Sequence, residues 1–433
     1  MSPATPTTSP VPYSAGLRYG LLGLPLAFMA LPLYVHLPNV YASRYGMPLA
    51  TLGAVLLLAR LLDAVTDPWL GHLSDRLQAR SSRHVLLAAS LAALLLVLGV
   101  ALLFFPPWRQ PDDPVALLGV LTLTFLAFSL LAIAHQSWGA RLGGDEVQRA
   151  RTVAWREGAG LLGVVLASVL PSWLGWGEWV GLFALALAAG CWAWGRSPVP
   201  PPTQPVQPRP WREDLLHPWR HAPFRWLMGV FVLNGMASAV PATLVLFFIQ
   251  DRLQAPDMEP FFLATYFLAA AASMPLWMRG VVRWGLARCW LAGMLLSVAV
   301  FAWAAGLSAG DVGAFWAVCA LSGLALGTDL ALPGAMLAGL IAERGDGGQR
   351  EGAYFGWWNL ATKLNLALAA GLVLPLLGLL GYQPGSTSAV ALQALTLSYA
   401  VLPCALKLLA SALLYLAFVR RTSRPLSSLA KTP

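Results

Sequence analysis

The sequence has little charge and little cysteine. Only 11% of its 433 residues are charged, against roughly 25% in soluble domains, while 58% are hydrophobic. Four cysteines are too few for a disulfide scaffold, and this hydrophobicity excludes a disordered chain. Walker A, H-E-x-x-H and G-x-S-x-G motifs are absent, so an ATP-driven pump or a membrane hydrolase has no support and no enzyme is predicted. The apolar residues run in long blocks, which indicates an integral membrane protein.

The positive charges gather on one predicted side of the membrane. The chain has 28 Lys and Arg against 19 Asp and Glu, a net charge of +9. When the loops are assigned to alternating sides from a cytoplasmic start, 22 of these 28 residues are cytoplasmic and three are external. This is the positive-inside distribution, which sets orientation. The basic balance therefore reflects topology, and no nucleic-acid partner is expected.

Twelve apolar runs are long enough to cross a bilayer, which takes about 20 residues. Because the runs are continuous and lack a period-two alternation, they favour helices over a barrel. The predicted fold class is an all-α membrane protein with both termini cytoplasmic. The expected spans are 17–37, 48–70, 84–105, 115–140, 153–173, 178–195, 224–249, 259–279, 286–308, 313–341, 353–380 and 391–419.

A proline-rich polar connector divides the spans into two sets of six. The predicted segments are a flexible N-terminal tail (1–16), a first bundle (17–196), a cytoplasmic linker (197–223), a second bundle (224–419) and a cytoplasmic tail (420–433). The start has no signal-peptide pattern. Two bundles joined by a linker are typical of secondary transporters.

The second span carries charges where they are costly. A charge at a helix centre costs around 2.5–3.5 kcal/mol, so it indicates function by default. Arg60, Asp63, Thr66 and Asp67 follow a spacing that places them on one helix face. Two carboxylates and a hydroxyl can hold Na⁺ or share a proton. The structural alternative is an Arg60–Asp63 ion pair with a helix-end aspartate.

The eleventh span provides a candidate counter-charge, Lys363. It lies about 20 Å along the helix from Arg350, and Asp63 lies about 18 Å from Asp75 on a helix running the other way. Both depths are near the midplane, where transporter sites lie. Trp358 and Asn359 lie on the same span and could line a substrate cavity, although packing is the alternative for the tryptophan.

Three weaker candidates lie elsewhere in the spans. Asp329 is a lone acid near Pro333, a proline that could interrupt its helix, and is either a second acidic site or a local cap. His135 and Gln136 lie toward the end of the fourth span, where a lone histidine is usually a hydrogen-bonded core group. Asp329, His135 and also Arg60 of the second span are possible accessory residues, and Gln136 is a candidate substrate or coupling residue.

Three stretches resemble the glycoside-pentoside-hexuronide:cation symporters, the melibiose-permease-like branch of the major facilitator superfamily. LLARLLDAVTDPWLGHLSDR (57–76) is similar to the signature Asp-x-x-x-Asp-Pro-x-x-Gly-x-x-x-Asp-Arg of this family. Residues 137–163 resemble its helix-four-to-five segment, and residues 332–372 its helix-ten-to-eleven segment. The resemblance implies a twelve-helix fold, alternating access and Na⁺- or H⁺-coupled uptake.

The resemblance also implies roles for single residues. The cation-binding aspartates of the family correspond to Asp63 and Asp67, with Thr66 and a helix-four Ser129 contributing oxygens. The coupling lysine corresponds to Lys363, and a helix-five arginine to Arg156.

The sequence departs from the family at the sugar-binding positions. The two sugar-binding aspartates of melibiose permease are replaced by Ala27 and Ala132, and a stacking tryptophan by Gln136. The acidic residue after Ala-Met-Leu-Ala in helix ten is Gly339. The sequence therefore keeps the cation-binding residues of the family but not its sugar-binding residues, so a less hydroxylated, amphipathic or anionic solute becomes credible.

The sequence thus predicts a cation-coupled symporter of a small organic solute in a bacterial-type inner membrane. Na⁺ or H⁺ would bind at Asp63, Thr66, Asp67 and Ser129 and act through Lys363 on a substrate site between the bundles. The protein would be a monomer in the lipid bilayer with no cofactor. The alternatives are a lysolipid or organic-anion symporter, a proton-driven exporter, and a scaffold or assembly factor without transport.

Overall fold

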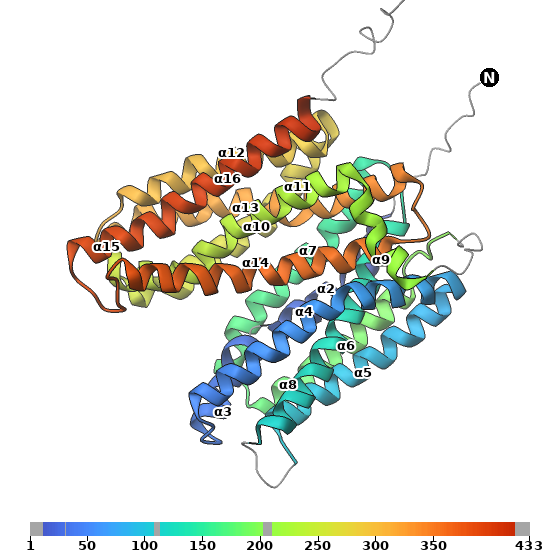
Figure 1. Ribbon diagram of the computed structural model, residues 1–433, viewed down its shortest axis with the longest axis horizontal. Helices are drawn as coiled ribbons and strands as arrows, with labels where there is room; N and C mark the ends of the chain where they lie inside the picture. Colours follow the sequence, from blue (N-terminus) through green and yellow to red (C-terminus); the bar gives the residue numbers. More distant parts are fainter. Residues whose placement is uncertain (1–11, 31, 108–112, 202–209, 421–433) are drawn as a thin grey trace, which may run out of the picture. The chain divides into compact units, whose positions relative to one another are not determined.

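The computed structural model describes residues 12–30, 32–107, 113–201 and 210–420, and the regular structure within these ranges is helical (Figure 1). The predicted tails lie largely outside the described residues, and so does the middle of the predicted linker.

The described residues of the first half of the chain form eight α-helices. They are α1 (Tyr13–Gly20), α2 (Gly23–Phe28), α3 (Leu37–Ser43), α4 (Leu49–Arg80), α5 (Ser82–Phe104), α6 (Pro114–Arg141), α7 (Glu146–Val169) and α8 (Trp176–Gly195). A π-helical turn, Pro32–His36, precedes α3.

The second half begins with a short helix and continues with longer ones. They are α9 (Trp211–Arg220), α10 (Ala222–Phe247), α11 (Glu259–Trp284), α12 (Leu286–Trp303), α13 (Val312–Arg344), α14 (Glu351–Leu379), α15 (Ala389–Thr396) and α16 (Leu402–Leu414). π-Helical turns at Phe248–Arg252, Leu397–Val401 and Tyr415–Val419 extend α10, join α15 to α16, and extend α16.

Ten helical segments of the described chain are long and apolar enough to cross a membrane. The expected spans 17–37 and 48–70 are not among them. The first coincides with the short helices α1 to α3, and the second lies in α4, which carries the charged residues of the 57–76 signature. The all-helical fold is confirmed, and the count of twelve spans stays a prediction.

Polar side chains fix several helix starts. Asp113 accepts the backbone N–H of Val115 at 2.8 Å at the start of α6, and Asp145 accepts that of Gln148 at 2.8 Å at the start of α7. These bonds satisfy N–H groups that have no partner within the helix. The possible break at Pro333 does not occur, since α13 runs through this proline without interruption. Helices packed in a membrane protein tolerate the missing backbone bond.

The described chain forms two compact units. Unit 1 comprises residues 1–215 and 341–357, and unit 2 comprises residues 216–340 and 358–433. The core of unit 1 stacks Trp179 between Phe28 and Phe183, with ring centroids 5.0 and 5.7 Å apart. In unit 2, Phe248 stacks on Tyr399 at 4.2 Å.

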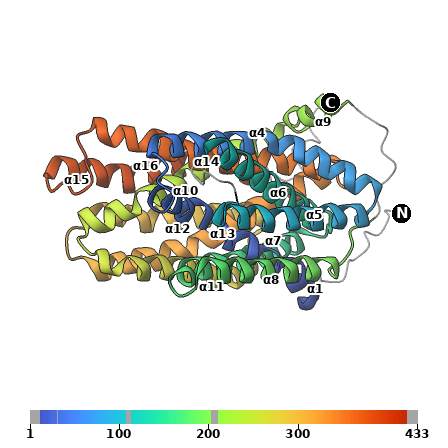
Figure 2. The same ribbon diagram turned by 90° about the horizontal axis from the view of Figure 1, so that it is seen from below.

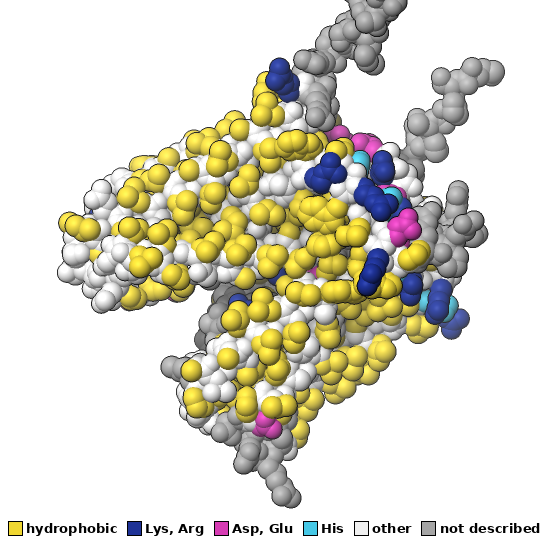
Figure 3. All heavy atoms as spheres, in the orientation of Figure 1, with side chains coloured by type: hydrophobic (Ala, Val, Ile, Leu, Met, Phe, Trp, Pro, Cys, Tyr) yellow, Lys and Arg dark blue, Asp and Glu magenta, His cyan; other side chains and the backbone are white. Residues whose placement is uncertain are grey.

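The outer faces of the helices are apolar, as a lipid environment requires. Within unit 1, α5 runs beside α6 and α8 (Figure 2). Its free face carries four leucines at helical spacing, Leu87, Leu91, Leu94 and Leu98, which are 49–59% exposed. Hydrophobic side chains cover the helix flanks in the same way (Figure 3). Such a stripe on a soluble protein would be an aggregation hazard, whereas in a bilayer it faces lipid.

Candidate functional site: buried charges in each unit

A buried carboxylate pair on α4 forms the first candidate site, which lies entirely in unit 1. Asp63 is 3% exposed and Asp67 is fully buried. The two lie one helical turn apart on α4, a helix that packs against α6. Ser129 of α6, itself 2% exposed, donates its hydroxyl hydrogen to Asp63 Oδ1 at 2.7 Å. The structure therefore brings Ser129 of α6 to Asp63, one helical turn from the buried Asp67.

The other polar residues of this stripe are arranged differently. The Thr66 hydroxyl donates to the backbone carbonyls of Leu62 and Asp63, at 2.9 Å each. Its hydrogen is thus directed to its own helix, and its oxygen keeps lone pairs for another contact. Arg60 is exposed, unlike the two aspartates.

Arg156 and His135 lie in a second polar group of unit 1. Arg156 pairs with Glu157, the next residue on α7, with Nε and Nη2 at 3.0 and 2.5 Å from Oε1. The Nε2 of His135 lies 2.8 Å from the carbonyl oxygen of Tyr19, and the Tyr19 hydroxyl donates to the carbonyl of His135 at 3.0 Å. This reciprocal pairing fixes α1 against α6. His135 is thus held as a hydrogen-bonded core residue, and the adjacent Gln136 is partly exposed.

Lys363, Trp358 and Asn359 belong to the part of α14 in unit 2. Lys363 and Asn359 are half-buried, and Trp358 is 8% exposed with its ring stacked on Phe231. That stacking gives Trp358 a packing role within unit 2. The expected approach of Lys363 to the aspartates of unit 1 stays a prediction.

Asp329 has a partner that the sequence analysis did not assign. Lys407 of α16 lies with its Nζ 2.6 Å from Asp329 Oδ2, and the indole of Trp290 donates to Asp329 Oδ1 at 2.9 Å. Both ionic side chains are at most 10% exposed. The available signal was that each is an isolated intramembrane charge, because such charges need partners.

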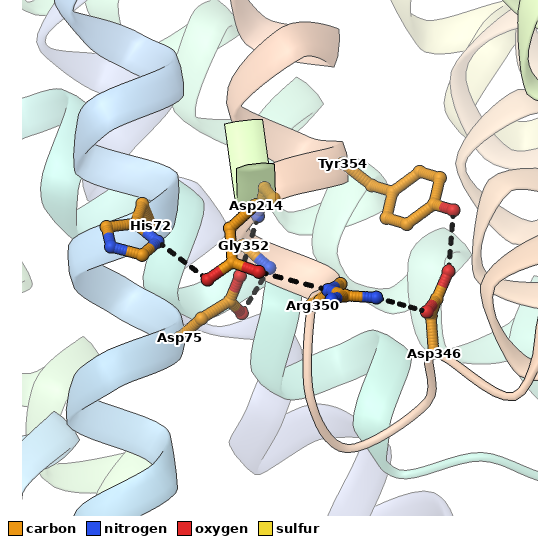
Figure 4. Close-up of polar contacts among 8 residues, drawn as sticks. His72, Asp75, Asp214, Asp346, Arg350, Gly352 and Tyr354 are labelled. Carbon is orange, nitrogen blue, oxygen red and sulfur yellow. Dashed lines mark hydrogen bonds and ion pairs between the residues drawn. The ribbon is translucent and has the colours of Figure 1, made fainter. Parts of the chain in front are cut away.

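Asp75 connects the end of α4 to the start of α14 within unit 1. Its two carboxylate oxygens accept the N–H groups of Gly352 at 2.6 Å and Ala353 at 2.8 Å (Figure 4). The backbones approach so closely that a Cβ on Gly71 would collide with the carbonyl oxygen of Gly352. The carboxylate therefore caps a helix N-terminus, where negative charge is favourable.

A chain of ionic contacts surrounds this cap (Figure 4). Asp214 of α9 lies 3.6 Å from His72 Nδ1 and 3.3 Å from Arg350 Nε. Arg350 also contacts Asp346 at 3.1 Å, and Asp346 accepts the hydroxyl hydrogen of Tyr354 at 2.8 Å. No motif in the sequence marks these residues for a role, although several lie in the stretches that carried the resemblance. The contacts join α4, α9 and α14 in unit 1.

Comparison with known proteins decides the family. The family model described as "MFS/sugar transport protein" matches residues 16–420. The chain belongs to this family. The resemblance to sugar:cation symporters of the major facilitator superfamily is thereby confirmed.

Two curated relatives were found by sequence. The "Inner membrane symporter YicJ" of Escherichia coli is 25% identical over 245 residues, and the alignment spans 52% of each chain, about half the length of this relative. The "Putative sugar efflux transporter" of Deinococcus radiodurans is 30% identical over 307 residues, covering 65% of this chain and 73% of the relative.

Solved structures share the fold. A bacterial homologue of the iron transporter ferroportin matches with a TM-score of 0.69 and 15% identity, covering 95% of this chain and 99% of that chain. The fucose:proton symporter of E. coli matches with a TM-score of 0.65 and 12% identity, covering 92% and 98%. The chain is therefore a multi-pass membrane transporter with the major facilitator fold and is not an enzyme.

Proposed function

We propose that this transporter is a cation-coupled symporter of a small organic solute in the bacterial inner membrane. The observation that carries the proposal is the hydrogen bond from Ser129 to Asp63, beside the fully buried Asp67. These side chains supply hard oxygen ligands at an intramembrane position, which suits Na⁺ or a shared proton. The E. coli relative, named as an inner membrane symporter, supports the location and the transport mode.

The energetics favour a bound cation at this pair. Two carboxylates one turn apart repel each other while both are ionised, which is an electrostatic penalty. A Na⁺ ion or a proton removes part of that penalty. If the solute and the cation favour the same conformation of the protein, each raises the affinity for the other.

A sodium titration of the purified protein tests this proposal. We expect Na⁺ to raise the melting temperature of the wild type, because a ligand of the folded state stabilises it. Asp63→Asn should lose this response, whereas Asp257→Asn, which changes an exposed aspartate of unit 2, should keep it. If H⁺ is the coupling ion, the same two variants should separate in solute-driven proton uptake by proteoliposomes. An Asp63→Asn protein that responds like the wild type in both assays would contradict the proposal.

A second candidate is proton-driven export, which the name of the D. radiodurans relative favours. The same carboxylates would then exchange protons for solute. Transport in inside-out vesicles with an imposed proton gradient separates the two candidates, since only the exporter accumulates solute there. The solute need not be a sugar. Ala27 and Ala132 occupy the positions that correspond to the sugar-binding aspartates of melibiose permease.

A further inference from the structure

Unit 2 contains a cavity of about 310 Å³ that the proposed cation site does not involve. It lies among α10, α11, α12, α13 and α16, and its walls are mostly apolar. Phe262, Phe301, Val245 and Leu326 are among the side chains that line it. This volume is at the lower end of the range for small-molecule sites, which are typically apolar with a few polar groups.

One end of the cavity is ionic. Asp329 and Lys407 both line it, and their side chains pair at 2.6 Å. The indole of Trp290 holds the second oxygen of Asp329 at 2.9 Å. The pair is electrically neutral as it stands, and its two charges come from different helices.

Two phenol groups lie at the same cavity. Tyr266 and Tyr399 both line it, and Tyr399 is only 3% exposed. Within the part of the chain that the structure describes, neither hydroxyl donates a hydrogen bond to a protein group. A hydrogen bond to an acceptor stabilises a buried hydroxyl, so these two hydroxyls are available hydrogen-bond donors for a ligand.

The lining selects the class of ligand. A free sugar needs a polar partner for most of its hydroxyls, and these mostly apolar walls offer few. A ligand with an apolar body and one charged end matches the apolar walls and the ionic end of the cavity. Since the tyrosines and Lys407 are all hydrogen donors, the charged end that fits is an anion.

We propose that this cavity binds an amphipathic organic monoanion, such as an aromatic or aliphatic carboxylate, together with one proton. The anion displaces Asp329 from the ammonium group of Lys407, and Asp329 takes up one H⁺ from the solution. The site is separate from the carboxylate pair of α4, so the inference goes beyond the proposed cation-coupled symport.

Charge balance explains why the proton is required. Lys407 carries one positive charge, so an anionic ligand beside an ionised Asp329 would leave a net negative charge buried in the bundle, which is costly. With Asp329 ionised before binding and protonated after it, the cavity is neutral in both states. The other titratable groups at the cavity are Tyr266 of α11, Cys319 of α13, Cys404 of α16 and Tyr399, and α10 and α12 line it with non-titratable side chains.

Calorimetric titration of the purified full-length protein with 4-phenylbutyrate tests the inference. This probe is a carboxylate that stays ionised from about pH 6 to about pH 8. When one proton binds with the anion, affinity should fall by about tenfold for each unit of pH over this range. The matched neutral amide, 4-phenylbutanamide, should bind at least about tenfold more weakly at the lower pH. A flat pH profile for the wild type, or equal binding of the amide, would overturn the inference.

Three variants locate the site. Asp329→Asn keeps the charge of Lys407 without a titrating partner, so it should bind phenylbutyrate with no pH dependence. Lys407→Gln should lose at least about tenfold in affinity. Asp257→Asn, which changes an exposed aspartate outside both sites, should leave binding unchanged. Titrations in sodium-free buffer distinguish failure here from failure of the proposed cation site. If Lys407→Gln does not fold, the pH profile of Asp329→Asn decides, and a profile like that of the wild type overturns the inference.

Discussion

Two acidic side chains that sequence patterns single out, Asp63 of α4 and Asp329 of α13, each lie beside a specific partner. Asp63 accepts the hydroxyl of Ser129, and Asp329 accepts both Lys407 and Trp290. An isolated charge in this environment would be costly, so these pairings are what allow the charges to be retained. The two sets differ in kind. The set in unit 1 bonds a carboxylate to a hydroxyl, whereas the set in unit 2 pairs a carboxylate with an ammonium group.

At the residue scale, Ser129→Ala should weaken Na⁺ binding about tenfold, or about 1.4 kcal/mol. The variant removes a candidate oxygen ligand and a hydrogen bond to a carboxylate, which is typically worth about 1.5–3 kcal/mol. Calorimetric titration with NaCl measures the change. Ser90→Ala is the matched control, because Ser90 is exposed on α5 and bonds only to a carbonyl of its own helix, that of Leu86. An equal effect of the two variants would remove Ser129 from the site.

The carboxylate pair could be predicted from the sequence, and its neighbours only in part. A spacing of four places Asp63 and Asp67 on one helix face, because an α-helix has a fixed period. Ser129 entered through the family resemblance, since nothing local marks it as a partner of a residue 66 positions away. The pairing of Asp329 with Lys407 was missed for the same reason. Contacts between helices depend on packing, which one sequence does not encode in any short pattern.

At the scale of elements, the start of α14 depends on α4. Asp75 supplies the acceptors for the N–H groups of Gly352 and Ala353, and glycines at positions 71 and 352 let the backbones meet. Helix extents were largely predictable because long apolar runs need helices in a membrane. The breaks between α1, α2 and α3 and the unbroken course of α13 through Pro333 were not, since neighbouring helices decide whether a proline or glycine interrupts a span.

Asp75→Ala should loosen the start of α14. Loss of a helix cap costs about 0.5–2 kcal/mol, so the amides of residues 352–354 should exchange hydrogen about tenfold faster. Hydrogen-exchange mass spectrometry of peptides from residues 345–357 measures this. The matched control is Asp113→Ala, which removes the cap of α6 and should raise exchange only at residues 115–116. Unchanged exchange at α14 would show that its start is held by other contacts.

At the scale of the whole molecule, the two halves of the sequence are not the two units of the structure. Residues 341–357 come from the second half of the chain but pack with unit 1. Asp75, Asp214 and Arg350 supply the contacts that hold this segment there. The proline-rich linker divides the chain by sequence order, whereas the compact units are defined by contacts between residues. The two divisions differ here because residues 341–357 follow the linker in sequence but contact unit 1.

The membrane topology supplies a further prediction at this scale. If α1 to α3 and α4 both cross the bilayer, the turn after Ser43 is external and the turn after Arg80 is cytoplasmic. A cysteine at exposed Ser43 should then react with a membrane-impermeant maleimide in intact cells, as should one at exposed Ala309, whereas one at exposed Arg83 should react only after permeabilisation. The parent protein corrects for the native cysteines, three of which are buried. If Ser43→Cys reacts only in permeabilised cells while Ala309→Cys reacts in intact ones, the first two segments do not both cross. In that case the apolar surface of residues 17–37 would be too small to offset the cost of inserting the helix breaks of that segment and the charged residues of α4 into the membrane.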